Sequence, residues 1–285
     1  MNRRDFIKKS LIAGTVVAAG AATGGYMFID KTADGKFMES FGKLPSGNRL
    51  ELIKQSPNYK DGQFQNQLPT TVMTGKSGSF KATWKFLTDK PENTEPAQPI
   101  PSVKTDLTAL SADKDFIIWF GHSSYLLQVN GIKILVDPVL IQGSPVKFIN
   151  KPYPGTDIYK PQDIPEVDFL VISHDHWDHL DYFTVKELKS KIKNIVVPLG
   201  VGEHFEYWKF PLDKITELDW YKDAEIGGTK FYCLPARHFS GRSIFRNKTL
   251  WASFLWNLLT VKKFISAAIP VTVRTLNIQV NIFPT

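Results

Sequence analysis

The chain has 285 residues, 42% of them hydrophobic, with one cysteine and a formal net charge of +7. The single thiol, Cys233, excludes an intrachain disulfide scaffold and a cysteine-rich zinc site, and its apolar neighbours favour a small core residue. The excess charge lies at the two ends, with +3 in residues 1–26 and +3 in residues 255–285, which argues against a nucleic-acid-binding domain.

The first 26 residues have the pattern of an export signal. Arg3 and Arg4 precede Phe6 and a lysine, and an apolar run follows from residue 11 to residue 22. This order resembles the twin-arginine signal, and the run is shorter than the roughly 20 apolar residues of a membrane span. We expect residues 1–26 to engage the twin-arginine export machinery and to send the protein to the periplasm or the membrane. An uncleaved anchor and a chance basic start are the alternatives.

Residues 27–110 are rich in proline, glycine and small polar residues and contain few periodic apolar runs. This composition predicts an extended lead-in that wraps a domain, or a partly disordered segment. Residues 111–254 have the pattern of a folded domain. Its first elements are three strands, at residues 116–120, 125–129 and 132–136. The last two are joined by Asn130-Gly131, which favours a type I′ hairpin turn because both positions need positive φ.

Strands and helices alternate in the rest of this domain. Residues 167–173 are largely apolar and β-branched, which predicts a buried strand, and residues 182–192 have helical apolar spacing. A strand at residues 194–199, a helix at 203–210 and a strand at 229–234 follow. Hairpins that precede alternating strands and helices predict an α/β fold, a sandwich with mixed sheets.

Four side chains that commonly bind metals follow the buried strand: His174, His176, Asp178 and His179. Residues two apart on extended backbone point to the same side, so His174 and His176 can offer ring nitrogens to one ion. If the chain then turns into a helix, Asp178 and His179 can reach a second ion. Imidazole and carboxylate suit zinc, and also iron or manganese. The alternative is a polar loop with chance histidines, but the position directly after a strand favours a metal site.

Residues 171–181, Val-Ile-Ser-His-Asp-His-Trp-Asp-His-Leu-Asp, resemble the metallo-β-lactamase superfamily. The closer resemblance is to its branch of N-acyl-phosphatidylethanolamine-hydrolysing phospholipases D and ascorbate-6-phosphate lactonases. Three further segments fit this branch, at residues 119–124, 135–138 and 235–242, so the resemblance extends from about Phe41 to Phe254. It implies an αββα sandwich with the metals at one edge of the two sheets.

By this resemblance, His238 is the third histidine on the first of two zinc ions, and Asp178 orients a metal-bound hydroxide that acts as nucleophile. The implied substrate is a phospholipid of the N-acyl-phosphatidylethanolamine type, cleaved as by a phospholipase D. A lactone or another phosphoester is the alternative. Arg242 either pairs with the phosphate through its planar guanidinium or is an ordinary surface arginine. His122 approaches the site or has a structural role, and His204 is expected to be a surface or capping residue.

The chain departs from this branch after Phe254. The branch supplies a bridging aspartate, in a Gly-Asp-[Ser/Thr]-Gly-Tyr type segment, and a final histidine, whereas residues 255–285 contain no Asp, Glu or His. Read one base out of frame, the codons for residues 265–275 permit Ile-Ser-Gly-Asp-Ser-Gly-Tyr-Gly-Pro-His. We therefore expect a C-terminally truncated domain, with a frameshift near residues 253–254 and an out-of-frame tail. With two protein ligands for the second ion, we expect one bound ion and an essentially inactive chain.

Overall fold

The computed structural model describes residues 36–70, 95–145, 150–258 and 262–266. The chain divides into two units, residues 1–42 and residues 43–285. In the first unit, helix α3 (Lys36–Ser40) ends where the Ser40 hydroxyl donates to the Phe37 carbonyl. The expected export signal lies outside the described residues. Among those that are described, no helix has both the length and the apolar character that crossing a membrane requires.

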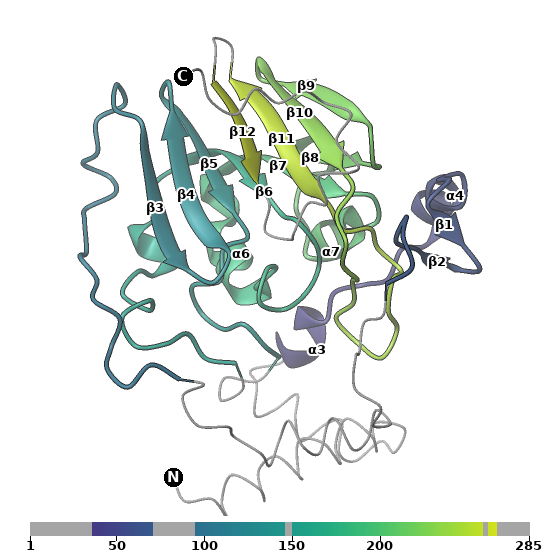
Figure 1. The fold of residues 1–285 in the computed structure, drawn as a ribbon, viewed down its shortest axis with the longest axis horizontal. Helices are drawn as coiled ribbons and strands as arrows, with labels where there is room; N and C mark the ends of the chain where they lie inside the picture. Colours follow the sequence, from purple (N-terminus) through teal and green to yellow (C-terminus); the bar gives the residue numbers. More distant parts are fainter. Residues whose placement is uncertain (1–35, 71–94, 146–149, 259–261, 267–285) are drawn as a thin grey trace, which may run out of the picture. The chain divides into compact units, whose positions relative to one another are not determined.

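A six-stranded mixed sheet forms the centre of the second unit (Figure 1). Its strands pair in the order β3-β4-β5-β6-β7-β8, antiparallel from β3 to β5 and parallel from β5 to β8. The strands are β3 (Phe116–Gly121), β4 (Ser124–Val129), β5 (Ile132–Val136), β6 (Val167–Val171), β7 (Ile192–Pro198) and β8 (Ile215–Leu218). In the β4–β5 turn, Asn130 has φ 51° and Gly131 has φ 77°, as the type I′ hairpin requires.

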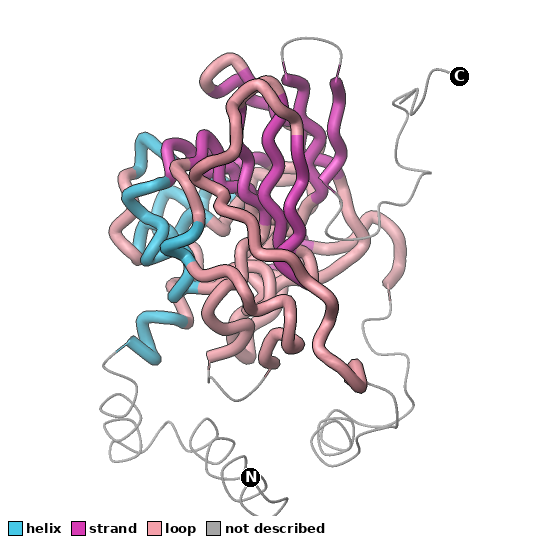
Figure 2. Tube along the Cα trace, turned by 90° about the vertical axis from the view of Figure 1, so that its left-hand side faces the viewer, coloured by secondary structure: helices cyan, strands magenta, loops and turns pink. Residues whose placement is uncertain are grey.

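Short helices cover one face of this sheet (Figure 2). They are α6 (Tyr182–Leu188) and α7 (Gly202–Tyr207), with the 3-10 turns η1 (Pro161–Asp163), η2 (Lys189–Lys191) and η3 (Leu212–Lys214). Asp181 caps the start of α6, because its carboxylate accepts from the Phe183 amide at 3.0 Å. Val185 of α6 and Phe205 of α7 belong to the same buried cluster as Leu170 of β6. The helices are therefore held to the sheet by their apolar sides.

A second, antiparallel sheet packs against the other face. Its strand order is β12-β11-β10-β9, formed by β9 (Asp223–Ile226), β10 (Thr229–Leu234), β11 (Ser253–Leu258) and β12 (Lys262–Ser266). The ring of Phe231 in β10 lies 4.9 Å from that of Phe169 in β6 and 6.1 Å from that of Trp256, between ring centroids. These residues and Cys233 share one buried cluster. The described part of residues 116–266 thus forms a helical layer and two sheets.

Strand β11 crosses the domain boundary that was expected at Phe254. Residues 253–258 pair without a break with residues 229–234 of β10, and β12 continues the sheet to Ser266. Strand residues therefore lie on both sides of residue 254, and the domain boundary expected there stays a prediction. The frameshift itself stays a prediction, which the DNA around the codon for Phe254 would test.

Part of the lead-in packs onto the domain. It contains α4 (Gly47–Lys54), β1 (Tyr59–Lys60) and β2 (Gln63–Phe64). The Arg49 guanidinium, 14% exposed, donates to carboxylates of Glu203, Glu206 and Glu217, each at 2.6 Å. Phe64 is fully buried in the cluster between the two sheets. Residues 47–64 of the lead-in therefore pack against the domain and contribute to its core.

Replacing Phe231 with alanine should destabilise the protein by about 3–5 kcal/mol, because the rings around it cannot close the cavity left between the sheets. Urea unfolding followed by tryptophan fluorescence measures this change. The control is Leu212→Ala at a side chain that is 58% exposed. This control should change the free energy of unfolding by less than about 0.5 kcal/mol. Equal effects of the two substitutions would show that Phe231 does not join the sheets.

Candidate metal centre

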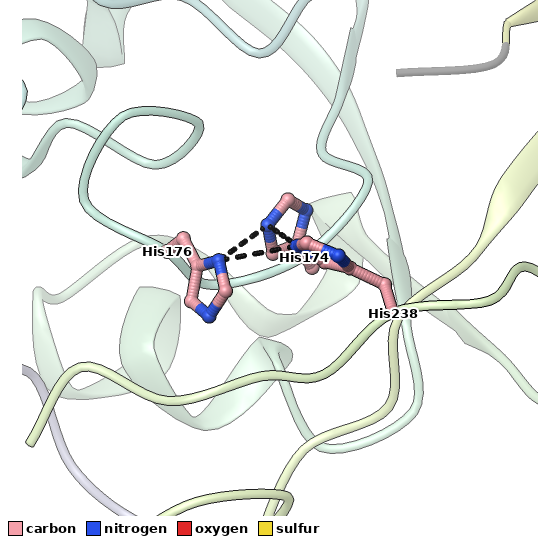
Figure 3. A group of neighbouring side chains, drawn as sticks. All are labelled: His174, His176 and His238. Atoms are coloured by element: carbon pink, nitrogen blue, oxygen red, sulfur yellow. Dashed lines mark hydrogen bonds between the residues drawn. The ribbon is translucent and has the colours of Figure 1, made fainter. Parts of the chain in front are cut away.

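Three histidine side chains meet at the ends of strands β6 and β10 (Figure 3). His174 and His176 follow β6, and His238 follows β10. The His174 Nε2 atom lies 2.9 Å from His176 Nδ1 and 3.1 Å from His238 Nε2, and the latter two atoms are 3.3 Å apart. Zinc–nitrogen bonds of about 2.0–2.1 Å at tetrahedral angles place neighbouring nitrogens about 3.3 Å apart. The spacing of the three nitrogens therefore fits a single metal ion.

His238 is held in place by the lead-in. The Asn66 side-chain amide donates to the His238 carbonyl at 2.7 Å, and the His238 amide donates to Asn66 Oδ1 at 3.0 Å. The reciprocal pair satisfies both backbone groups of His238, as a strand partner would. No local pattern in the sequence indicated this contact, because the two residues are 172 positions apart.

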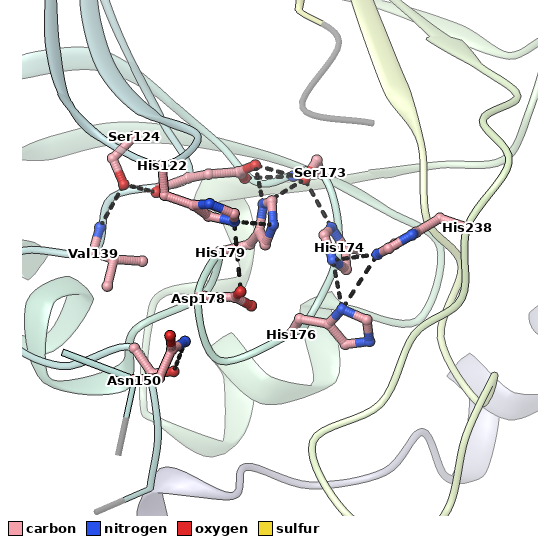
Figure 4. A network of polar contacts seen from close by, with 12 residues as sticks. His122, Ser124, Val139, Asn150, Ser173, His174, His176, Asp178, His179 and His238 are labelled. Atoms are coloured by element: carbon pink, nitrogen blue, oxygen red, sulfur yellow. Dashed lines mark hydrogen bonds and ion pairs between the residues drawn. The ribbon is translucent and has the colours of Figure 1, made fainter. Parts of the chain in front are cut away.

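A second group of donors lies beside the first (Figure 4). It consists of His122, Asp178 and His179. The Nε2 atoms of His122 and His179 are 3.2 Å apart, and His122 Nε2 lies 3.5 Å from Asp178 Oδ2. The two groups adjoin, since the ring centroids of His174 and His179 are 4.0 Å apart. The structure thus brings the five expected ligands together and adds His122, so the second group has three donors where the sequence indicated two.

Asp137 sets the orientation of two rings at once. Its Oδ1 accepts from the Ser173 amide at 2.7 Å, and its Oδ2 accepts from Ser173 Oγ at 2.6 Å and from His179 Nδ1 at 2.8 Å. Ser173 Oγ in turn lies 2.9 Å from His174 Nδ1, and because its own hydrogen is donated to Asp137 it can accept from that nitrogen. In both rings Nδ1 is thus engaged and Nε2 is the nitrogen left for a metal ion, the arrangement found around ligating histidines.

The surroundings of the first group keep its rings neutral. Burial, together with the neighbouring rings, lowers the pKa of His174 well below its usual value and that of His238 to about 4. Burial also lowers the pKa of His176. In His179 burial opposes protonation, but the hydrogen bond to Asp137 outweighs it and raises the pKa. Neutral imidazoles are the form that binds metal, so the first group is prepared for an ion near neutral pH.

Asp175 supports the loop from the side opposite to the ligands. Its carboxylate accepts from His204 Nε2 at 3.2 Å, Thr249 Oγ1 at 2.8 Å and the Gly241 amide at 2.7 Å. Burial opposes ionisation, but the bonds from His204 and Thr249 lower the pKa of Asp175 to about 2. His204 is 1% exposed, so the expectation of a surface or capping residue was wrong. On extended backbone, alternate side chains point to opposite sides, so Asp175 points away from His174 and His176. This alternation was the signal in the sequence that Asp175 has a buried partner.

Arg242 lies beneath the metal loop and is 5% exposed. Its guanidinium donates to the carbonyls of Asp175 at 3.1 Å and Leu180 at 2.6 Å, and it lies 3.9 Å from the centroid of the Trp177 ring. These contacts support a structural role over contact with a phosphate. Cys233 is fully buried, and burial raises the pKa of its thiol, as expected of a core residue.

Residues 133–265 match the model of a family described as "Beta-lactamase superfamily domain". This part of the chain is similar to that superfamily domain. The α/β architecture with a central mixed sheet is the fold that the sequence resemblance implied, and the match extends beyond Phe254 into β12.

The proteins to which this chain is similar carry different names. An uncharacterized protein of Mycobacterium tuberculosis is 39% identical over 205 residues, which cover 71% of this chain and 55% of the relative. The N-acyl-phosphatidylethanolamine-hydrolyzing phospholipase D 1 of Caenorhabditis elegans is 33% identical over 154 residues, 49% of this chain and 42% of the relative. The chain spans about half the length of these relatives. A crystal structure of CmlA, a diiron beta-hydroxylase from Streptomyces venezuelae, is 22% identical, has a TM-score of 0.41, and covers 60% of this chain and 30% of that one.

The double variant His174→Ala/His176→Ala should lose the metal of the first group, because His238 would remain as its single ligand. Metal content after refolding with zinc and exhaustive dialysis, measured by plasma mass spectrometry, checks this. A thermal melt of each protein shows that both are folded. If the double variant kept as much metal as the parent, the three histidines would not form a metal site.

Proposed function

We propose that the domain hydrolyses a phosphodiester bond, and that its substrate is a phospholipid of the N-acyl-phosphatidylethanolamine type. The observation that carries the proposal is the triangle of neutral imidazoles formed by His174, His176 and His238, within the superfamily's hydrolase domain. The name of the nematode relative supports the substrate class. Because one fold hosts many chemistries, the surface beside the site must also suit the substrate.

Zinc is the metal we propose, since three histidine nitrogens at this spacing suit its tetrahedral shell. Iron and manganese remain the alternatives, because the same donors bind them. When bound, the metal supplies a Lewis acid for a phosphoryl oxygen and lowers the pKa of a water ligand.

The side chains around the metal position the reactants. His174, His176 and His238 keep lone pairs available because burial holds them neutral. The Asp178 side chain is 39% exposed and borders the second group. We propose that its carboxylate accepts a hydrogen bond from the attacking water and fixes the direction of attack, which is how positioned groups contribute to rate.

The loop after His238 supports a lipid phosphodiester over a small lactone. Ile244 and Phe245 are 83% and 53% exposed, and Arg246 next to them is also exposed. The Arg246 guanidinium lies 5.2 Å from the centroid of the Phe239 ring, and that ring lies 4.5 Å from the ring of His176, between centroids. A phospholipid has a phosphate that this cation can bind and acyl chains that this apolar tip can contact. Arg246 therefore replaces the buried Arg242 as the proposed phosphate contact.

The test is a comparison of hydrolysis rates between the parent and His174→Ala/His176→Ala, each refolded with zinc. The substrates are bis(p-nitrophenyl) phosphate, N-palmitoyl-phosphatidylethanolamine in mixed micelles, and a γ-lactone. With His122 adding a third donor to the second group, we expect measurable turnover instead of the inactivity expected from the sequence. The parent should exceed the double variant by at least about 100-fold on both phosphodiesters, since metal catalysis contributes several kcal/mol. Equal rates would identify an inactive remnant, and faster lactone cleavage would identify a lactonase.

We also propose that residues 1–26 direct export by the twin-arginine route. The proposal is supported by the arginine pair and the short apolar run that follows it. Replacing Arg3 and Arg4 with lysine should leave the protein in the cytoplasm, because the route reads the arginine pair. Cell fractionation and immunoblotting measure the distribution. An unchanged distribution would contradict the signal.

A further inference from the structure

His122 occupies a strained position at the edge of the metal centre. It lies in the turn between β3 and β4 with φ at +46°, a left-handed backbone conformation that residues other than glycine adopt rarely. Gly121 before it has φ +102°, and a Cβ there would lie 2.8 Å from Thr156 Cβ. The Trp119 indole donates to the His122 carbonyl at 2.9 Å. Surrounding contacts therefore impose this turn, and such imposed strain is concentrated at functional sites.

The turn brings the His122 ring to two residues of the metal loop (Figure 4). Its Nε2 atom lies 3.2 Å from His179 Nε2 and 3.5 Å from Asp178 Oδ2. Because Asp137 accepts from His179 Nδ1, the Nε2 atom is the nitrogen of His179 that remains for a ligand bond beside His122. Separations of this size match the edges, about 3.3 Å, of a tetrahedron of nitrogen and oxygen around a metal ion.

We propose that His122 is the third protein ligand of a second metal ion, held together with Asp178 and His179. The inference rests on the proposed metal-dependent function, and it adds a ligand for the second ion from the β3–β4 turn. Two imidazoles and a carboxylate form a donor set that suits zinc. The His122 side chain is 57% exposed, so one side of the group remains open to water or substrate, as catalytic sites require.

The two metal groups share one support. Asp137 bonds to His179 of the second group, and Ser173 Oγ bonds to both Asp137 and His174 of the first group. The protein scaffold would therefore fix the distance between a second ion at His122 and the first ion. Paired ions at a set separation are the arrangement that clamps both oxygens of a phosphodiester displacement.

The experiment is a titration of the metal-free chain with zinc and with cobalt, comparing the parent, His122→Asn and His122→Asp. We expect two ions per parent chain, and one ion for His122→Asn with the second dissociation constant raised at least about 100-fold. His122→Asp keeps a carboxylate ligand and should retain the second ion. The cobalt absorption bands of the second ion should be lost in His122→Asn alone. Ser123→Asn, which places the same side chain on the neighbouring residue, is the matched control and should bind two ions.

The outcomes separate this inference from the proposed function. Unchanged stoichiometry and cobalt bands in His122→Asn would overturn the role of His122, as would a parent that binds one ion. Hydrolysis that still depends on His174 and His176 would leave the proposed function standing in either case. Zinc that binds at neither group, with no hydrolysis, would overturn both.

Discussion

The buried carboxylate of Asp137 is the contact on which the metal centre depends. It lies at the end of β5, and its three donors come from Ser173 and His179, just beyond β6. Strands β5 and β6 pair in parallel, so the register of the central sheet decides where this carboxylate meets the loop. An ionised group without water is costly unless hydrogen bonds compensate it. The compensation here comes from the loop that carries the ligands, so burial of Asp137 and order in the loop depend on each other.

Asp175 repeats this arrangement on the other side of the loop. Its partners belong to α7 and to the segment between β10 and β11, whereas those of Asp137 belong to the loop itself. The ligands His174 and His176 therefore lie between two carboxylates, each satisfied by several donors. A site supported in this way holds its ligand spacing through hydrogen bonds that do not involve the metal, which is the property called preorganisation.

Local patterns predicted the parts of the molecule that local interactions determine. The β4–β5 hairpin follows from Asn130-Gly131, and the four clustered ligands follow from alternation after a buried strand. His238 could be assigned through the resemblance alone, since nothing near it in the chain marks it as a ligand. The role of His122 was left open and His204 was expected at the surface, because their partners lie 57 and 29 residues away. The strand that runs through Phe254 was not expected, because an apolar tail and an apolar strand look alike until the pairing with β10 is known.

The hydrogen bond between the Lys43 amide and His204 Nδ1, 3.2 Å long, links the lead-in through His204 to Asp175 and the metal loop. The residues that it joins are 161 positions apart, and the pair that holds His238 is separated further still. Contacts between residues so far apart in the chain form late in folding, because the entropy of the long loop is lost before the contact can stabilise it. The metal centre is therefore assembled near the end of folding. Binding of a metal ion at full affinity would therefore indicate that these distant parts of the chain had already come together.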